Sequence, residues 1–182
     1  EIKKYNSFYD IVYTSLFLNS ESNYINGKAI DGNTTDKAIT RFIKDYNSNI
    51  KIINRKAFSS EDKYSYVKTS NKVYFKGASE LFLKHISKVL NTDGSEKVIY
   101  NLEYLEKIIN KYTDNGYRVL LNCYGENEKL NSLTFICLIV IEDTIRKETP
   151  DALKTIKSAG VNIVMITGDA KKTAINVANS LN

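Results

Sequence analysis

Four segments of the chain have the residue pattern of β-strands. Residues 50–58 (IKIINRKAF) and 63–77 (KYSYVKTSNKVYFKG) alternate apolar and polar positions. The second segment is interrupted by Ser70-Asn71, which predicts the turn of an antiparallel hairpin. Residues 117–125 (YRVLLNCYG) and 132–143 (SLTFICLIVIED) predict two further strands of the same sheet.

Apolar residues three or four positions apart predict helices in four other segments. These are 10–18, 32–46 (GNTTDKAITRFIKDY), 78–90 (ASELFLKHISKVL) and 101–116 (NLEYLEKIINKYTDNG). In the second segment we expect Thr34 or Thr35 as the N-cap. The buried stripe of that helix is expected to consist of Ala38, Ile39, Phe42 and Ile43.

The pattern changes after Glu142-Asp143. Residues 149–160 (TPDALKTIKSAG) predict a helix with Pro150 in its first turn and Gly160 after its end. The apolar run 161–166 (VNIVMI) is typical of a parallel strand covered on both faces, and 171–181 predicts a final helix. We therefore expect an α+β fold, with an antiparallel β-sheet flanked by helices over 1–142. A partial α/β, Rossmann-like segment is expected over 143–182.

Composition narrows the class of protein. Hydrophobic residues make up 42% and charged residues 26% of the 182-residue chain, and the longest apolar run, Phe135–Ile141, is far too short to cross a bilayer. Cys123 and Cys137 lack metal-ligand spacing and are expected to be buried free thiols. This composition predicts a soluble, cytoplasmic piece of protein.

The net charge of +5 is compatible with nucleic acid or with a polyphosphate ligand. The lysines are spread along the chain, which favours a solvated basic surface over a nucleic-acid interface. A nucleic-acid-binding module stays an alternative on the strength of the charge and the 13 tyrosines.

Four motifs in the first part of the chain carry candidate chemistry. They are GNTTD (32–36), AFSSEDK (57–63), YFKGASE (74–80) and NGYRVL (115–120). In the third motif a strand delivers Lys76 to a helix start, where backbone amides favour an anion. In the second, Phe58 at a strand end could stack on a base. Each motif alone is also explained by an ordinary turn, cap or surface position.

Two further motifs follow, EDTIR (142–146) and MITGDAKKTA (165–174). Ligands of open α/β sheets bind beyond the carboxyl ends of the strands, where Thr167-Gly168-Asp169 is expected to lie. The amides at the start of the last helix would face a phosphate there.

In this order the six motifs resemble those of the cytoplasmic ATP-binding region of P-type cation-transporting ATPases. The resemblance covers nearly the whole chain and is closest to the branch of calcium pumps and related cation pumps, in a bacterial member. The heavy-metal branch carries a His-Pro pair, whereas His85 here is followed by Ile86. The resemblance implies a nucleotide-binding (N) domain over 1–142 and part of a haloacid-dehalogenase-like phosphorylation (P) domain over 143–182.

The resemblance also implies a role for each matching residue of the N domain. Phe58 would stack on adenine, and Asp36 would bond near its amino group. The residues expected around them in the nucleotide pocket are Ser59, Lys63, Lys76 and Gly77, with Gly77 leaving room beside the ring. Arg118 would pair with a phosphate of the nucleotide tail.

In the second domain, Asp143 and Arg146 match the ends of the family's hinge motif. Thr167, Gly168 and Asp169 match a motif beside the phosphorylation site, where Thr167 and Asp169 would support catalysis. The sequence departs from the family's pattern with Thr34 in place of proline, Asp36 in place of glutamate, Ala170 in place of a polar residue and a hinge without proline.

The family's phosphorylated aspartate motif does not occur in these residues and is expected before Glu1, and the acidic motif completing the Mg²⁺ site is expected beyond Asn182. The implied protein is an integral membrane pump of a bacterial plasma membrane, with this piece in the cytoplasm. It would use ATP and Mg²⁺ and couple hydrolysis through an aspartyl-phosphate to cation transport, with calcium as the expected cation. The piece itself is expected to bind ATP as a monomer without turnover and without any metal ligand. Its partners would be the rest of the P domain, the actuator domain and the membrane domain. The alternative is a soluble haloacid-dehalogenase-like phosphohydrolase.

Overall fold

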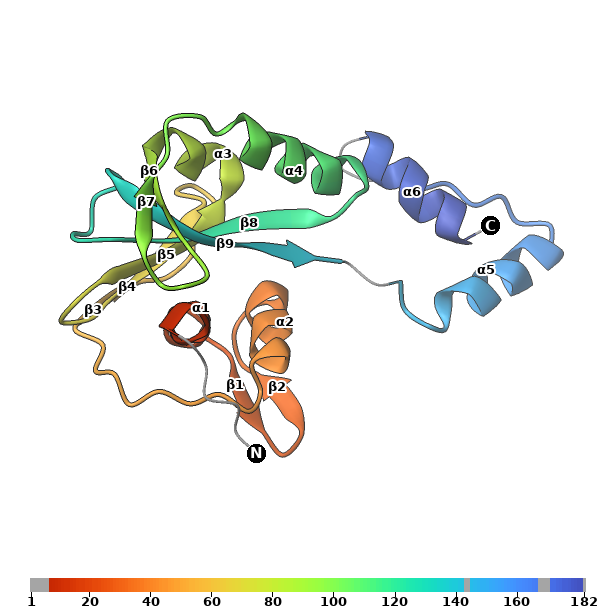
Figure 1. Cartoon of the computed structure of the whole chain (residues 1–182). Coiled ribbons are helices and arrows are strands. Elements are labelled where there is room, and N and C mark those ends of the chain that lie inside the picture. Colours follow the sequence, from red (N-terminus) through yellow and green to blue (C-terminus); the bar gives the residue numbers. More distant parts are fainter. Residues whose placement is uncertain (1–6, 143–144, 167–170, 182) are drawn as a thin grey trace. The chain divides into compact units, whose positions relative to one another are not determined.

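The computed structural model describes residues 7–142, 145–166 and 171–181, and it divides into two compact units. The first unit comprises 1–103 and 119–139, and the second comprises 104–118 and 140–182. Figure 1 shows the helices and strands along the chain. Each unit is described by itself below.

A seven-stranded sheet organises the first unit, in the order β3-β4-β5-β8-β9-β6-β7. The strands are β3 (Asn54–Lys56), β4 (Tyr64–Lys68), β5 (Val73–Ala78), β6 (Ile86–Leu90), β7 (Glu96–Val98), β8 (Arg118–Gly125) and β9 (Leu133–Ile141). The predicted hairpin is confirmed: β4 and β5 pair antiparallel, with Lys68 opposite Val73 across the turn. The α+β class with a sheet flanked by helices is therefore confirmed. The sheet is mixed, because β6 runs parallel to β9.

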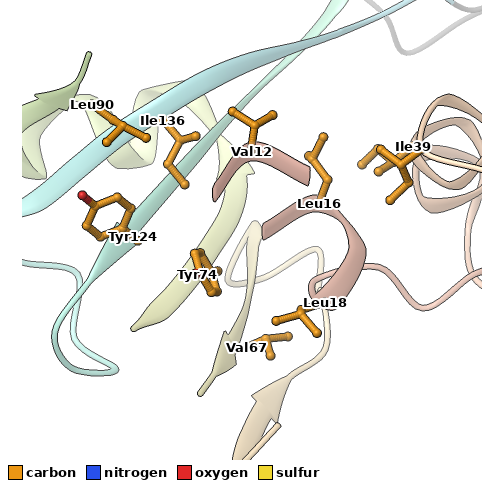
Figure 2. Packing of buried hydrophobic residues seen from close by; sticks show 10 residues of the cluster. Val12, Leu16, Leu18, Ile39, Val67, Tyr74, Leu90, Tyr124 and Ile136 are labelled. Carbon is orange, nitrogen blue, oxygen red and sulfur yellow. The ribbon is translucent and has the colours of Figure 1, made fainter. Parts of the chain in front are cut away.

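Two helices cover one face of this sheet (Figure 1). They are α1 (Ser7–Leu18) and α2 (Thr34–Phe42), close to their predicted positions. Their apolar side chains meet those of the sheet in one cluster, shown in Figure 2, which contains Val12, Leu16, Leu18, Ile39, Ile43, Val67, Tyr74, Leu90, Tyr124 and Ile136. Burial of this cluster is the main force that places the end of α1 and the start of α2 over β4 and β5.

The opposite face of β4 and β5 carries aromatic residues. Phe75 and Phe82 are fully buried, and the ring of Tyr64 lies 6.3 Å and 6.2 Å from theirs. Phe82 comes from α3 (Ser79–Phe82), the short helix directly after β5. Strand alternation explains this division, since Tyr74 and Phe75 must point to opposite faces.

The capping of α2 differs from the prediction. Asn33, with φ −83° and ψ 177°, is the N-cap, and its Oδ1 accepts a hydrogen bond of 2.9 Å from the Asp36 amide. Thr34 is instead the first helical residue. Of the predicted buried stripe, Ile39 and Ile43 are buried, whereas Phe42 is 68% exposed and stacks beside Tyr13.

The helix predicted over 78–90 is wrong in its second half. The chain forms α3, a 3₁₀ turn over Leu83–His85 and then β6, which pairs with both β7 and β9. Ile86 and Val89 are β-branched and fit a pleated strand. Pairing on both sides gives the backbone N–H and C=O groups of β6 hydrogen-bond partners. The stabilisation from this pairing outweighs the weak helical periodicity of the segment.

Two further features were not predicted, namely β7 and a separate two-stranded hairpin of β1 (Asn23–Ile25) with β2 (Lys28–Ile30). Asn26 and Gly27 connect the two strands with φ of 50° and 78°. This Asn-Gly pair is the turn that most favours a two-residue hairpin, so the signal was present in the sequence.

In the second unit, α4 (Glu103–Asp114, of which 104–114 belong here) ends before Gly116, whose φ is 84°. Helices α5 (Thr149–Ser158) and α6 (Lys171–Leu181) also match the predictions, with Pro150 in the first turn of α5. The strand predicted over 161–166 is wrong, because these residues adopt no regular structure and Ile166 is 94% exposed. A strand needs a neighbour for its backbone hydrogen bonds, and none pairs with 161–166 among the described residues.

Candidate functional site

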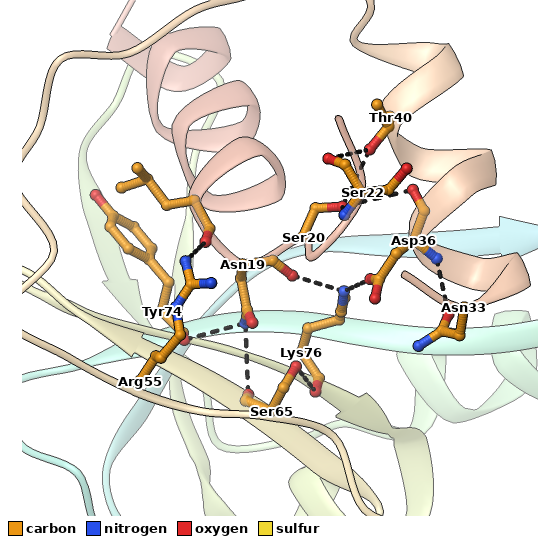
Figure 3. Close-up of polar contacts among 11 residues, drawn as sticks. Asn19, Ser20, Ser22, Asn33, Asp36, Thr40, Arg55, Ser65, Tyr74 and Lys76 are labelled. Carbon is orange, nitrogen blue, oxygen red and sulfur yellow. Dashed lines mark hydrogen bonds and ion pairs between the residues drawn. The ribbon is translucent and has the colours of Figure 1, made fainter. Parts of the chain in front are cut away.

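A buried ion pair joins β5 to the start of α2. Lys76 donates from Nζ to Asp36 Oδ1 at 2.5 Å and to the Asn19 carbonyl oxygen at 2.6 Å (Figure 3). Lys76 is 5% exposed and Asp36 is 3% exposed. Burying two charges is costly, so the pair depends on close geometry and on extra hydrogen bonds such as that from Asn19.

The surroundings of this pair hold both partners in place. Asn19 follows α1 and donates from Nδ2 to the carbonyl oxygens of Tyr74 and Ser65, on the two strands of the hairpin. Asp36 lies in the first turn of α2, where a carboxylate is favoured by the helix dipole. The site is therefore built from three segments that are far apart in sequence, which Figure 3 shows converging on Lys76.

A small hollow, about 10 Å³ in volume, lies beside the ion pair at this end of the first unit. Its walls come from the end of α1 and the residues after it, from α2, and from β3, β4 and β5. The lining residues are Leu18, Asn19, Ser20, Glu21, Asp36, Arg55, Lys56, Phe58, Ser65, Tyr66, Val67 and Lys76. The structure thus brings three sequence-predicted residues together, namely Phe58, Asp36 and Lys76. We call this the Phe58 hollow.

Phe58 lies at the wall of this hollow and is 47% exposed. Among the described residues its ring has no aromatic neighbour. A large exposed aromatic ring beside a buried charge pair can cover one flat face of a heterocycle, which is the geometry that stacking requires.

Ser59 and Lys63 belong to the loop that follows Phe58. The Ser59 hydroxyl donates to the Asp62 carboxylate at 2.7 Å, and the Lys63 amide donates to the Ser59 carbonyl oxygen at 2.8 Å. The Lys63 ammonium pairs with Glu80 at 3.4 Å, with both side chains largely exposed. Neither Ser59 nor Lys63 lines the Phe58 hollow, so their part in nucleotide binding stays a prediction.

Gly77 has a structural role at the edge of the hairpin. A Cβ there would come within 2.6 Å of the Lys63 carbonyl oxygen and of Tyr64 Cβ. The glycine is therefore required by the close approach of β4, whatever room it leaves beside a bound ring.

The remaining predicted residues lie outside this arrangement. Arg118 is exposed at the start of β8 and belongs to the second unit, as does the exposed Arg146. Asp143 and the motif Thr167-Gly168-Asp169 lie outside the described residues.

Several residues of the Phe58 hollow were missed by the sequence analysis. Asn19, Arg55 and Lys56 are the clearest cases, because each contributes a polar contact. Arg55 donates to the Leu18 carbonyl oxygen at 3.4 Å, and Lys56 pairs with Asp62 at 3.0 Å. Arg55 and Lys56 lie in the segment directly before Phe58, so that proximity was the available signal. For Asn19, at a helix end, no local pattern indicated a role.

A larger cleft adjoins the Phe58 hollow and shares part of its wall. The shared residues are Leu18, Ser20, Glu21 and Arg55, and the remainder of the lining comes from α1, β1, α2 and the segment 44–52. Its lining residues include charges of both signs, namely Glu21, Asp45, Lys44 and Arg55.

The described residues contain neither a group of metal-ligating side chains nor a helix that could span a membrane. No group of three or more His, Cys, Asp or Glu side chains suited to a metal ion occurs among the residues that the structure describes. Within those same residues, no helix combines the length and apolar character needed to cross a membrane.

The chain has relatives among known calcium-transporting ATPases. The chain is similar to plasma membrane calcium-transporting ATPase 2 of Oreochromis mossambicus, with 35% identity over 124 residues, covering 60% of this chain and 11% of the relative. It is 32% identical over 125 residues to plasma membrane calcium-transporting ATPase 1 of Gallus gallus, covering 60% of this chain and 10% of the relative. It is 29% identical over 178 residues to plasma membrane calcium-transporting ATPase 4 of Homo sapiens, covering 81% of this chain and 14% of the relative. The chain therefore spans only about a tenth of the length of these relatives.

The family model described as P-type ATPase, cytoplasmic domain N, matches residues 9–148. That match includes α1, α2 and the whole seven-stranded sheet, and with them every residue of the Phe58 hollow. The chain belongs to the family of P-type ATPase cytoplasmic N domains.

Proposed function

We propose that this chain binds ATP through the Phe58 hollow, as the nucleotide-binding part of a calcium-transporting P-type ATPase. The observation that carries the proposal is the buried Lys76–Asp36 pair lining the same hollow as the exposed ring of Phe58. Adenine presents a flat apolar face, an amino group that donates and ring nitrogens that accept. The lining of the Phe58 hollow includes a residue of matching chemistry for each of these three features, namely Phe58, Asp36 and Lys76.

Phe58 supplies the flat contact, and the Asp36 carboxylate supplies the acceptor for the amino group. Among the described residues only Lys76 donates to that carboxylate, through Oδ1. The Lys76 ammonium is in turn a donor suited to a ring nitrogen or a hydroxyl of the nucleoside. Asp36 is one methylene shorter than the glutamate usual in the family, and its ion pair with Lys76 keeps it at the wall of the hollow.

The other predicted residues extend this proposal along the nucleotide. Ser59, Lys63 and Gly77 would lie around the ring or its ribose, and Arg118 would meet a phosphate. Asp143 and Arg146 would act at the hinge. Thr167, Gly168 and Asp169 would lie beside the γ-phosphate, where Thr167 and Asp169 would support phosphoryl transfer to an aspartate elsewhere in the parent protein.

At the level of the whole protein, we propose an integral membrane pump in the plasma membrane of a bacterium, with this domain in the cytoplasm. Mg²⁺ would arrive with the phosphates of ATP, and we assign no residue of this chain to it. The actuator, membrane and remaining phosphorylation domains would be its partners, and the isolated chain would be a monomer. Calcium is proposed because the relatives named above are calcium-transporting pumps.

Titration of the full 182-residue chain with ATP, followed by amide NMR, tests the nucleotide site. We expect saturable shifts centred on Phe58, Lys76 and Asp36, and smaller shifts of the same residues with adenosine. Tripolyphosphate is the control and should leave the Phe58 amide in place. The proposal fails if millimolar ATP shifts no resonance, or if the shifts centre on the larger cleft around Tyr24 and Tyr46. Calcium uptake by vesicles carrying the parent protein tests the transported ion.

A further inference from the structure

The loop that carries Phe58 is held by contacts that do not involve Phe58 itself. It runs from the end of β3, at Lys56, to the start of β4, at Tyr64. Phe58 is 47% exposed and has no aromatic neighbour among the described residues, so its position depends strongly on the loop backbone.

Asp62 closes this loop on one side. Its carboxylate accepts from the Ser59 hydroxyl at 2.7 Å, and its amide donates to the same hydroxyl oxygen at 3.0 Å. The amide of Lys63, the residue directly before β4, donates to the Ser59 carbonyl oxygen at 2.8 Å. These three bonds form a tight turn directly after Phe58.

Lys56 ties this turn to the sheet. Its ammonium lies 3.0 Å from Asp62 Oδ1, 3.3 Å from the Tyr64 hydroxyl and 4.4 Å from the centre of the Tyr64 ring. The hydrogen bond to Asp62 raises the pKa of Lys56, and the bonds from Ser59 and then Lys56 lower the pKa of Asp62, so both are charged at neutral pH. Tyr64 is anchored against the buried rings of Phe75 and Phe82.

The strand register places the side chains of Lys56 and Lys76 on opposite faces of the sheet. Lys56 is opposite Tyr66 in the β3–β4 ladder, and Ser65 is opposite Lys76 in the β4–β5 ladder. Since Ser65 and Tyr66 are adjacent, their side chains point to opposite faces, and so do those of Lys76 and Lys56. Lys56 lines the Phe58 hollow, but its ammonium is held by Asp62 and Tyr64, which do not line it.

We propose that Lys56, through Asp62, is a positioning residue for the nucleotide site: its ammonium holds the loop so that the Phe58 ring stands where the base stacks, and binds Asp62 and Tyr64 instead of the nucleotide. This inference rests on the proposed function of the Phe58 hollow. It assigns a role to a residue that no motif indicated. Its action is preorganisation, because a loop already fixed before binding loses less conformational freedom when the ligand arrives.

The test uses Lys56→Met and Asp62→Asn in the full chain, with Lys56→Arg as the conservative variant. Lys68→Met is the matched control, because Lys68 is also on the hairpin and forms a similarly exposed ion pair with Glu128 at 3.1 Å. The first measurement needs no nucleotide: amide relaxation of residues 57–62 in the free protein. We expect Lys56→Met and Asp62→Asn to increase the motion of Phe58 and Ser59, and Lys56→Arg and Lys68→Met to leave it unchanged.

The second measurement compares dissociation constants for ATP and for adenosine. We expect Lys56→Met to weaken both by the same factor, about two- to fivefold, the range that an exposed ion pair supports. The double variant Lys56→Met/Asp62→Asn should be no weaker than either single variant. A larger loss for ATP than for adenosine would overturn the inference, because Lys56 would then touch the phosphates.

The two proposals fail differently. If the wild-type chain binds no ATP, the proposed function fails, and the relaxation of the free loop still decides whether Lys56 positions Phe58. If ATP binds but Lys56→Met leaves both the loop motion and the two affinities unchanged, the positioning role is wrong and the nucleotide site stands.

Discussion

Lys76 and Asp36 form an ion pair 40 positions apart in sequence, with 2.5 Å between Nζ and Oδ1 and both side chains buried. The pair fixes the start of α2 against β5. It also places a positive and a negative charge in the wall of the Phe58 hollow. If the proposed function is right, stability and nucleotide recognition depend on the same two residues.

Lys76→Met is expected to destabilise the fold by about 3–5 kcal/mol, because it leaves the Asp36 carboxylate buried without its partner. Urea unfolding followed by circular dichroism measures this change in the free energy of unfolding. Lys63→Met is the control, since its pair with Glu80 is largely exposed and supports a change below about 1 kcal/mol. The double variant Asp36→Leu/Lys76→Met should recover part of the loss. Equal midpoints for Lys76→Met and Lys63→Met would contradict this account.

Phe58→Ala is expected to weaken ATP binding by roughly 1–3 kcal/mol, the range found for base–aromatic stacking. The side chain is half-exposed, so the free energy of unfolding should change little. Calorimetric titration with ATP measures the affinity. Tyr100→Ala is the matched control, because Tyr100 is the most exposed aromatic residue described and lies outside the hollow. Comparable losses of affinity in the two variants would count against stacking at Phe58.

Gly77→Ala is expected to destabilise the hairpin by about 1–3 kcal/mol, because the added Cβ would meet backbone and Cβ atoms of β4 at 2.6 Å. Gly125→Ala makes a useful comparison, since its closest contact would be the movable Leu133 side-chain tip at 3.2 Å. Thermal unfolding without nucleotide should therefore separate the two variants. If Gly77→Ala unfolds like the wild type and only its ATP affinity falls, the glycine serves the ligand and not the hairpin.

Both cysteine thiols are expected to resist alkylation in the folded protein. Burial raises the pKa of Cys137 from 9.0 to about 11 and raises that of the fully buried Cys123 further. At about pH 8 roughly one Cys137 side chain in a thousand would be thiolate, and access is also restricted. Mass spectrometry after iodoacetamide treatment checks this, with urea-unfolded protein as the positive control. Rapid labelling of the native chain would show that β8 and β9 open readily.

Glu96 is expected to lose its stabilising effect in acid. Hydrogen bonds from Lys88 and then Tyr124 lower the pKa of Glu96 below its usual 4.5. A carboxyl whose pKa is lower in the folded state stabilises above the unfolded value and loses that contribution as pH falls through the folded value. The wild type should therefore exceed Glu96→Gln in stability by at most about 1 kcal/mol at neutral pH, because the pair is partly exposed. Urea midpoints of both proteins should converge as the pH falls below 4.5 and through the lowered pKa of the folded state. A constant difference across this range would contradict the assignment.

Local patterns predicted most of the elements because they depend on nearby residues. Period-two alternation gave β4 and β5 around Ser70-Asn71, and Gly116 marked the end of α4. The prediction failed where the outcome depends on a distant partner. Residues 86–90 became β6 because β7 and β9 flank them, and residues 161–166 form no strand, with no partner among the described residues.

For the site, the motifs identified Phe58, Asp36 and Lys76 as candidates, and all three lie within the residues that the family model matches. Their roles with a nucleotide stay predictions. No motif indicated the contacts of Asn19 and Lys56, because each of these residues contacts a residue in another segment.

The family, the α+β class and the residues with suitable chemistry follow from residue type and order, so the amino-acid sequence is enough to predict them. Three further features depend on the folded arrangement: Lys76 pairs with Asp36, the close approach of β4 requires Gly77, and Lys56 pairs with Asp62 in the loop that carries Phe58. A buried charge or a close backbone approach is defined by the atoms around it, and no local pattern specifies those atoms. In this fold those atoms come from α1, α2 and the hairpin, which meet only when the common apolar core is buried.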